Sequence, residues 1–273
     1  MPPQKLRHPK PTDPPLYGNR RRVAFVTGAA RGIGKSIALR LAKDGLDIAI
    51  NDLNLSDLEE TKSQVEALGS RCFAIAGDVT DEKRVEAMIN EVVAALQYLD
   101  VMVANAGIAY GKAIVEMSAD EMLRVLKVNV VGVHLCYKYA AKRMIKQGTG
   151  GKLIAAASTA AFRGSSVISA YGASKFAVRG YNQTAALEFA KHSITCNCYA
   201  PGFVATNMTE WDNTDLPDAA KAKSIMENSI KQLPIKRIAQ VEDVSNLVSF
   251  LVSRDSDYIT GQTLPVGGGF HML

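Results

Sequence analysis

Tyr171 and Lys175 are the pair of side chains in this sequence with the clearest capacity for proton transfer, because they lie four residues apart. That spacing predicts that both project from one face of a helix, near its start. A phenol with a pKa of about 10 exchanges protons poorly at neutral pH, and a neighbouring ammonium favours the phenolate. The pair could therefore protonate or deprotonate an alcohol oxygen, although surface helices also carry such pairs by chance.

A serine and an asparagine add to this pair. Ser158 lies 13 residues before Tyr171, just past the carboxyl end of a predicted strand. Its hydroxyl could hold a carbonyl oxygen in place there. Asn129 lies in an otherwise apolar helical stretch, where a buried amide requires hydrogen-bond partners. A purely structural hydrogen bond is the alternative interpretation of Asn129.

A glycine-rich turn between the first predicted strand and the first predicted helix could bind a dinucleotide. Gly28, Gly32 and Gly34 let the backbone approach a pyrophosphate, which then meets the helix amide groups and the positive end of the dipole. Asp52 ends the second predicted strand, where a carboxylate can accept hydrogen bonds from ribose hydroxyls. The same carboxylate would repel the extra phosphate of NADP by up to about 4 kcal/mol, with Arg31 as a partial offset. The sequence therefore predicts NAD as the cofactor and disfavours NADP.

Short β-branched runs alternate with helical stretches from Arg22 onward. Strands are expected over residues 23–27, 47–51, 71–76, 99–104, 152–157, 194–199 and 262–266. Helices are expected over residues 33–44, 56–68 (with Ser56 and Glu59 as a capping box), 81–96, 120–146, 171–192 and 241–252, with weak helical content around 219–231. Parallel strands require right-handed crossovers, so the pattern predicts one doubly wound, seven-stranded parallel sheet. This is an α/β Rossmann fold in a single domain, with ligands beyond the carboxyl ends of the strands.

The first 21 residues form a separate segment. Six of the ten prolines lie there, which excludes a helix or a central strand. Residues 1–22 also hold six basic residues against Asp13 alone, so they account for the net charge of +5 and leave the body formally neutral. We expect a disordered tail over 1–21, with an organelle address or docking arm as the alternative, and a folded domain over 22–273 with a lid region at about 203–240. A neutral body gives no reason to expect nucleic-acid binding.

Composition narrows the remaining possibilities. Hydrophobic residues make up 47% and charged residues 22%, which is ordinary for a globular protein. No apolar run approaches the roughly 18 residues of a membrane span, and no signal peptide opens the chain. The four cysteines are too scattered for a disulfide framework, and no histidine or carboxylate cluster joins them as a metal site. We expect a cytoplasmic protein that binds neither a metal nor a membrane.

Taken together, the motifs resemble those of the classical short-chain dehydrogenase/reductase family. They are TGAARGIG at 27–34, ANAG at 104–107, Asn129, Ser158, YGASK at 171–175 and PGFVAT at 201–206. The resemblance implies that Tyr171 is the general acid/base, that Lys175 lowers its pKa and binds the nicotinamide ribose, and that Ser158 orients the carbonyl. It further implies that Asn129 holds a water in a proton relay.

The same resemblance implies binding residues. Cofactor contacts map onto Gly28, Arg31, Ile33, Asp52, Asp78, Val79, Asn105, Tyr171, Lys175, Val204 and Thr206. Substrate contacts map onto Ser158, Thr159, Ala160, Gly164 and Tyr171. The chain departs from the family pattern at Ala104, where Asn is usual, and at Gly267, where Asp is usual. The second departure puts the turn after the last strand in doubt.

Several stretches are similar to the NAD-linked diacetyl/acetoin reductases, also called 2,3-butanediol dehydrogenases. These are GIGKSIALRLAKDGLDIAINDLN, YGASKFAVRG and SDYITGQTLPVGGG. The resemblance implies hydride transfer between a small ketone or diketone and a secondary alcohol. Apolar residues on more than one face of the helices at 120–146 and 171–192, together with the family pattern, imply a homotetramer. An NADPH-dependent 3-oxoacyl-thioester reductase, a polyol dehydrogenase and a non-catalytic dinucleotide-binding scaffold remain as alternatives.

Overall fold

The computed structural model describes residues 20–206, 228 and 230–270, and its centre is one sheet of seven parallel strands. The strands run in the order β3-β2-β1-β4-β5-β6-β7. Their bounds are β1 Val23–Thr27, β2 Asp47–Asp52, β3 Cys72–Ala76, β4 Val101–Ala104, β5 Gly151–Ala156, β6 Ile194–Pro201 and β7 Thr263–Val266. The order reverses between β1 and β4, so the doubly wound Rossmann fold predicted from the sequence is confirmed.

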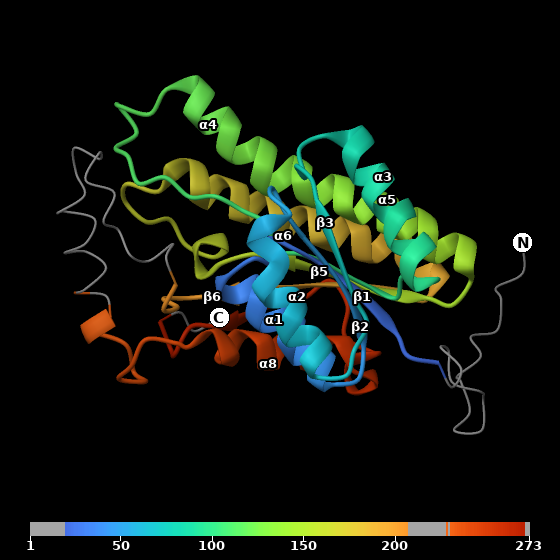
Figure 1. Cartoon of the computed structure of the whole chain (residues 1–273). Coiled ribbons are helices and arrows are strands. Elements are labelled where there is room, and N and C mark those ends of the chain that lie inside the picture. The colour runs from blue at the N-terminus through green and yellow to red at the C-terminus, as the bar shows by residue number, and fades with distance from the viewer. Residues whose placement is uncertain (1–19, 207–227, 229, 271–273) are drawn as a thin grey trace, which may run out of the picture.

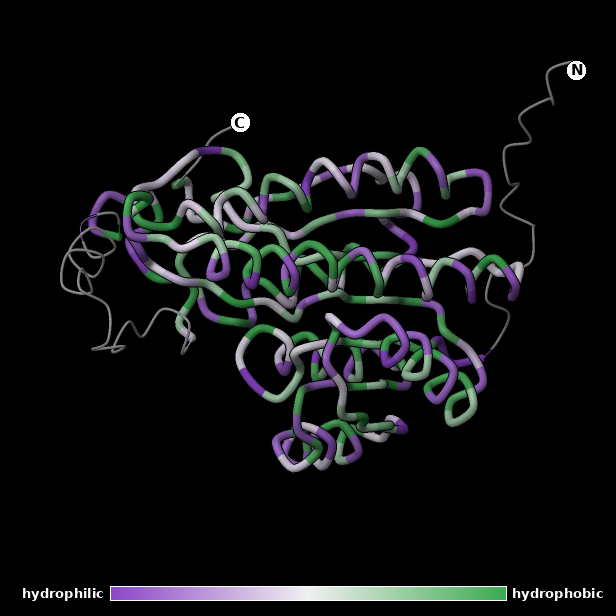
Figure 2. The backbone as a smooth tube through the Cα atoms, turned by 90° about the horizontal axis from the view of Figure 1, so that it is seen from above, coloured by the Kyte–Doolittle hydropathy of each residue, from purple (hydrophilic) through white to green (hydrophobic). Residues whose placement is uncertain are grey.

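Helices cover both faces of the sheet (Figure 1). One face carries α1 (Gly32–Lys43), α2 (Glu59–Ala67) and α8 (Val241–Val252), and the other carries α3 (Glu82–Leu96), α5 (Gly132–Gln147) and α6 (Ser169–Phe189). Figure 2 shows hydrophobic and hydrophilic residues alternating around the helical coils, as expected for helices with one buried face.

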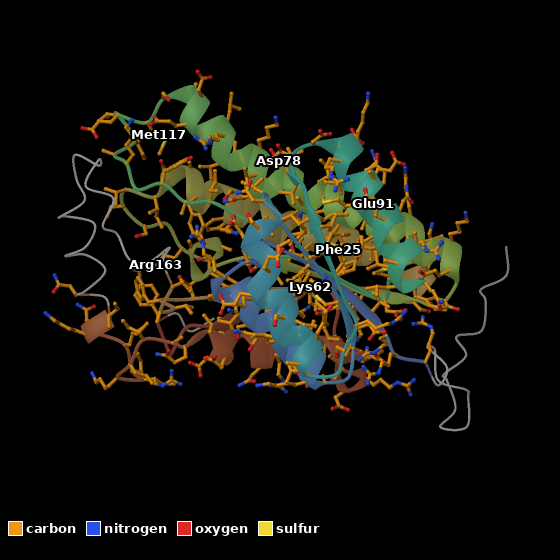
Figure 3. The ribbon with its side chains drawn as sticks, viewed as in Figure 1. Phe25, Lys62, Asp78, Glu91, Met117 and Arg163 are labelled. Atoms are coloured by element: carbon orange, nitrogen blue, oxygen red, sulfur yellow. The ribbon has the colours of Figure 1, made fainter. Side chains whose placement is uncertain are left out.

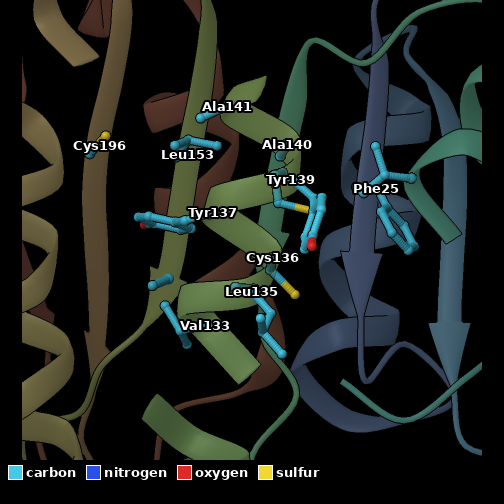
Figure 4. Close-up of a cluster of buried hydrophobic side chains, with 14 of the residues drawn as sticks. Phe25, Val133, Leu135, Cys136, Tyr137, Tyr139, Ala140, Ala141, Leu153 and Cys196 are labelled. Atoms are coloured by element: carbon cyan, nitrogen blue, oxygen red, sulfur yellow. The ribbon is translucent and has the colours of Figure 1, made fainter. Parts of the chain in front are cut away.

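The core is divided by the sheet because successive strand residues point to opposite faces. In β1, Val23 and Phe25 belong to the cluster beneath α3, α5 and α6, while Ala24 and Val26 belong to the cluster beneath α1 and α8. Figure 4 shows part of the first cluster, with Phe25 on β1 and several side chains of α5 among its members. The strands read as continuous apolar runs because both faces are covered.

The region expected as one helix over 120–146 is three segments. Helix α4 covers Ala119–Leu126, a π-helical turn covers Lys127–Val131, and α5 follows from Gly132. The helix expected from Ser56 also differs, because Ser56–Leu58 is a separate 3₁₀ turn and α2 begins at Glu59 without a side-chain cap. Capping boxes form elsewhere, between Ser118 and Glu121 at the start of α4 and between Gln240 and Asp243 at the start of α8.

Arg20 and Arg21, at the end of the predicted tail, contact the folded body. The guanidinium of Arg20 donates to both carboxylate oxygens of Asp100 at 2.7 and 2.6 Å and lies 3.6 Å from the centre of the Tyr98 ring. Arg21 donates to the carbonyl of Gly69 at 2.7 Å. Asp100 is fully buried just before β4, so a charged partner is required to offset its desolvation. The rest of the predicted tail, 1–19, lies outside the described residues.

Only the two ends of the predicted lid region fall within the described residues. Val204 and Ala239 form an isolated parallel bridge, and hydrogen bonds run from Ala205 N to Ala239 O at 2.9 Å and from Ala239 N to Phe203 O at 3.0 Å. The segments on either side of 207–227 are therefore tied to each other. None of the helices within 20–206 and 230–270 combines the length and the apolar character that crossing a membrane requires.

Candidate active site

The four predicted catalytic side chains lie at the carboxyl edge of the sheet and come from three elements. Ser158 follows β5, Asn129 lies in the π-helical turn, and Tyr171 and Lys175 lie in the first two turns of α6. A Cβ added at Gly107, which follows β4, would lie 3.2 Å from Oδ1 of Asn129 and 3.7 Å from Nζ of Lys175. The Nζ of Lys175 lies 5.4 Å from the centre of the Tyr171 ring. The tertiary structure thus brings together residues that are up to 46 positions apart in the sequence.

Lys175 is almost completely buried and is held by the backbone of β5. Its Nζ donates to the carbonyl of Ala156 at 2.7 Å. Burial lowers the pKa of Lys175 to about 8. Lys175 is therefore mostly protonated at neutral pH, and it loses its proton as the pH rises through about 8.

Tyr171 differs from the expectation of a lowered pKa. Burial raises the pKa of the phenol above its ordinary value, and a hydrogen bond with Ser158 offsets only part of that rise. The reason is geometric, since the ammonium of Lys175 is bonded to a backbone carbonyl and not to the phenol oxygen. In this arrangement the phenol stays protonated at neutral pH. It can therefore give a proton to a carbonyl oxygen.

Ser158 is fixed between two strand ends. Its hydroxyl oxygen accepts from the N–H of Ala160 at 3.1 Å, which caps the 3₁₀ turn over Thr159–Ala161. The hydroxyl also donates to the carbonyl of Pro201, at the end of β6, at 3.4 Å. These contacts orient the hydroxyl beside the phenol of Tyr171, so both groups can act on the same oxygen.

Asn129 connects the loop after β4 to α6. Its side chain accepts from Ile108 N at 2.9 Å and donates to Ile108 O at 2.9 Å and to the hydroxyl of Ser174 at 3.0 Å. Ser174 in turn donates to the carbonyl of Tyr171 at 2.6 Å. These are the structural hydrogen bonds of the alternative interpretation, and the water relay stays a prediction. π-Helical turns often occur at functional sites, and this one carries Asn129.

Ser174 is the residue that sequence reasoning missed. It is completely buried, and it links Asn129 to the backbone of Tyr171. The available signal was a small polar residue directly before Lys175, within the YGASK motif.

The glycine-rich turn is packed too closely for side chains. A Cβ at Gly34 would lie 2.1 Å from the carbonyl oxygen of Gly28, and Gly28 itself has a φ of +64°. Asn105 braces this turn from β4, because its amide donates to the carbonyls of Thr27 and Gly28 at 2.9 and 3.1 Å. Asn105 thus holds the backbone of the glycine-rich turn in place.

The predicted cofactor residues surround this turn and fit a dinucleotide. Asp52 accepts from Ala30 N at 3.0 Å and from Leu53 N at 2.9 Å, which leaves its charged oxygens at the rim of the turn. Thr206 lies over Gly32, with 3.6 Å between its Cγ2 and a Cβ added at that glycine. Arg31 is exposed before α1, and Ile33 packs against the core.

The remaining predicted cofactor residues lie farther along the strand ends. Asp78, labelled in Figure 3, is exposed and accepts from Thr80 N at 2.8 Å. Val79 is buried and lies against Gly132 at the start of α5. Val204 is buried beside β6. The predicted cofactor residues therefore follow the carboxyl ends of several strands, at the edge of the sheet that carries the glycine-rich turn.

The predicted substrate residues occupy the segment between β5 and α6. Thr159 and Ala160 are buried, and an added Cβ at Gly164 would meet no atom within 4 Å. An added Cβ at Gly267 would lie 3.1 Å from Cγ2 of Thr159. A larger residue at position 267 would therefore press on the residue that follows Ser158, which gives a packing reason for the glycine here. Within the described residues, no three His, Cys, Asp or Glu side chains are placed to hold a metal ion.

Comparisons with known proteins identify a family model and several relatives that match most of this chain. A family model described as enoyl-(acyl carrier protein) reductase matches residues 28–271. A short-chain dehydrogenase/reductase of Armillaria gallica is 46% identical over 91% of this chain and 95% of its own length. A diacetyl reductase, (S)-acetoin forming, of Staphylococcus epidermidis is 39% identical over 91% of this chain and 98% of its own length. A 3-oxoacyl-(acyl-carrier-protein) reductase of Staphylococcus aureus is 38% identical over 91% and 98%.

Solved structures are similar over nearly the whole chain. The acetoin dehydrogenase of Salmonella typhimurium is 34% identical, with a TM-score of 0.81 over 92% of this chain and 96% of that one. A xylitol dehydrogenase solved with NAD+ bound is 30% identical, with a TM-score of 0.84 over 91% and 98%. Residues 1–19 contribute nothing to the matched family model, which begins at residue 28.

Proposed function

Because the chain belongs to the short-chain dehydrogenase/reductase family and is an oxidoreductase of CH–OH groups, we propose that it interconverts a small ketone or diketone and a secondary alcohol with NAD(H). The observation that carries this proposal is the phenol of Tyr171 beside the oriented hydroxyl of Ser158, with the ammonium of Lys175 5.4 Å from the centre of the Tyr171 ring. The names of the diacetyl reductase and acetoin dehydrogenase relatives support the substrate class.

When bound, the nicotinamide cofactor supplies or accepts a hydride. The chain's own residues handle the carbonyl oxygen. Ser158 and Tyr171 donate hydrogen bonds to it, and Tyr171 transfers its proton as negative charge develops there. Lys175 places a positive charge near the phenol and so stabilises the phenolate that remains. Asn129 and Ser174 hold the backbone of Tyr171 in position. In the oxidative direction the same groups act in reverse.

Asp52 supports NAD as the cofactor. Its carboxylate lies at the rim of the glycine-rich turn, where it can accept ribose hydroxyls and would repel a 2′-phosphate. Gly28, Gly32, Gly34 and the N-terminal amide groups of α1 would hold the pyrophosphate. A scaffold without activity is a poorer explanation, because all four predicted catalytic residues are present and lie close together.

A substrate panel tests the proposed function. We expect the purified enzyme to oxidise NADH with diacetyl and acetoin, and to work less well with a 3-oxoacyl thioester or with a polyol and NAD+. Absorbance of the reduced cofactor, followed with NADH and NADPH in parallel, measures all four reactions. Activity confined to the thioester with NADPH would instead support the thioester-reductase alternative, which the Staphylococcus aureus relative represents.

We also propose that the enzyme is a homotetramer, as the resemblance predicted. One side of α6 carries a row of exposed residues that includes Phe176 and Leu187, the latter 84% exposed. Exposed apolar rows on a covering helix are typical of subunit interfaces. Light scattering at micromolar concentration should give about four times the chain mass of 29.4 kDa, and Leu187→Glu should reduce the measured mass. Leu68→Glu on the α2 side is the matched control, and a wild-type monomer would contradict the proposal.

A further inference from the structure

Lys112 joins the two loops that flank the candidate active site. It lies in the loop after β4, and its N–H donates to the carbonyl of Val167 at 2.6 Å, in the segment between β5 and α6. The next residue, Ile168, forms an isolated parallel bridge with Lys112. Figure 3 shows Met117 on the first loop and Arg163 on the second at the same end of the molecule. The loop after β4 is therefore connected to the segment after β5 at Val167, four residues before Tyr171.

Val167 has a backbone conformation that valine disfavours. Its φ is +59°, in the left-handed region, where a β-branched residue is a genuine outlier. Among the described non-glycine residues, Gln97 and Ser193 also have a positive φ, but neither is β-branched. Such a conformation persists only where surrounding contacts enforce it, and it is typical of functional sites. The hydrogen bond from Lys112 is a contact of this kind.

The side chain of Lys112 anchors its loop to α4. Its Nζ contacts both carboxylate oxygens of Glu121 at 2.8 and 2.9 Å. Glu121 is itself held by the N–H and the hydroxyl of Ser118, each at 2.8 Å, in the capping box that begins α4. The hydrogen bond from Lys112, with those from Ser118, lowers the pKa of Glu121 to about 2, so the carboxylate is ionised at neutral pH. Asn129 fixes the same loop at its other end through Ile108.

The segment after Val167 leads directly into the helix of the proton donor. The N–H of Gly172 donates to the carbonyl of Ile168 at 2.8 Å, which closes the first turn of α6 around Tyr171. A change in the backbone at Val167 would therefore tilt or shift this turn. A displacement of about 1 Å at a reacting group can cost on the order of a hundredfold in rate.

We propose that Lys112 is a positioning residue. It keeps Val167 in its left-handed conformation and thereby holds the phenol of Tyr171 in the position required for proton transfer. The inference rests on the proposed role of Tyr171 as proton donor. Lys112 does not act on the substrate in this scheme. Its ion pair with Glu121 fixes the loop, the loop fixes Val167, and Val167 fixes the start of α6.

Lys112→Met keeps the aliphatic stem and removes the ion pair. The left-handed region is disfavoured by about five- to thirtyfold for an L-residue other than glycine, so Val167 should then relax toward extended backbone. We expect kcat to fall by a similar factor, about five- to thirtyfold, while KM for NADH changes little because the glycine-rich turn is not involved. Glu121→Gln, which removes the other partner of the ion pair, should also lower kcat. Lys62→Met, which removes an exposed ion pair with Glu66 on α2, is the matched control and should leave kcat unchanged.

A glycine at position 167 distinguishes positioning from general destabilisation. Glycine adopts positive φ about as readily as negative φ, so the double variant Lys112→Met/Val167→Gly should recover kcat to within about threefold of wild type. A purely structural role for Lys112 predicts no such recovery, because the second substitution restores no contact. Circular dichroism and thermal unfolding of each variant verify that the fold is intact.

The outcomes separate this proposal from the proposed function. Wild-type kcat in Lys112→Met, or no recovery in the double variant, would overturn the positioning role. If Tyr171→Phe is inactive in the same assay, the proposed function stands in either case. Activity retained by Tyr171→Phe would instead remove the proton donor on which both proposals depend.

Discussion

Replacing Tyr171 by phenylalanine should lower turnover by about two to four orders of magnitude, the usual contribution of general acid–base catalysis. The substitution removes the hydroxyl that lies beside Ser158 and keeps the ring in its half-buried position. Binding of NADH, followed by fluorescence titration, should be nearly unchanged. Tyr258→Phe is the matched control, because Tyr258 is fully exposed and is not one of the predicted catalytic residues. Wild-type turnover in a correctly folded Tyr171→Phe enzyme would exclude Tyr171 as the proton donor.

The same residue predicts how rate depends on pH. Burial raises the pKa of Tyr171, so the phenol is protonated across the neutral range and can donate without a change of pH. The kcat for carbonyl reduction should therefore be constant near neutral pH and should fall only at alkaline pH. Oxidation of the alcohol requires the phenolate as base, so its kcat should rise with pH from neutral to alkaline values. A reductive kcat that rises from pH 7 to pH 9 would contradict the assignment.

Asp52→Ser should reduce the preference for NADH over NADPH at least tenfold. A like-charge contact of up to about 4 kcal/mol could give the wild type a preference of roughly two to three orders of magnitude in kcat/KM. The substitution removes the repulsion and also an acceptor for ribose. It further removes the acceptor for Ala30 N, which should weaken binding of both cofactors through the glycine-rich turn. The ratio of the two kcat/KM values is therefore the quantity to compare.

Two variants isolate the charge of Asp52. Asp52→Asn removes the charge with little change in shape. Asp78→Asn makes the same chemical change two residues after β3, where the side chain accepts only from Thr80 N among its described contacts. We expect the first to shift the ratio and the second to leave it nearly constant. A wild-type enzyme that prefers NADPH, or a ratio that Asp52→Ser does not alter, would show that another residue selects the cofactor.

The sequence was sufficient to predict the sheet and to assign the candidate functional residues to one of its edges. Apolar runs of strand length alternate with helical periodicity, and this local signal alone requires parallel strands with crossovers. Parallel strands place their carboxyl ends at one edge, so Ser158 and the glycine-rich turn could be assigned to one site before any coordinates were known. The spacing of Tyr171 and Lys175 was informative for the same reason, since four residues on a helix share a face.

Tertiary structure decided the surroundings and the hydrogen-bond partners of each of these side chains. Lys175 bonds to the carbonyl of Ala156 and leaves the phenol of Tyr171 with a raised pKa, a reversal that depends on burial and on a partner 19 positions away. The π-helical turn at Asn129 and the contact of Arg20 with Asp100 were likewise hidden in the sequence. Periodicity and spacing report the path of the backbone, which local propensity largely sets. Desolvation and hydrogen-bond partners depend on which distant atoms meet, and only the folded chain determines that.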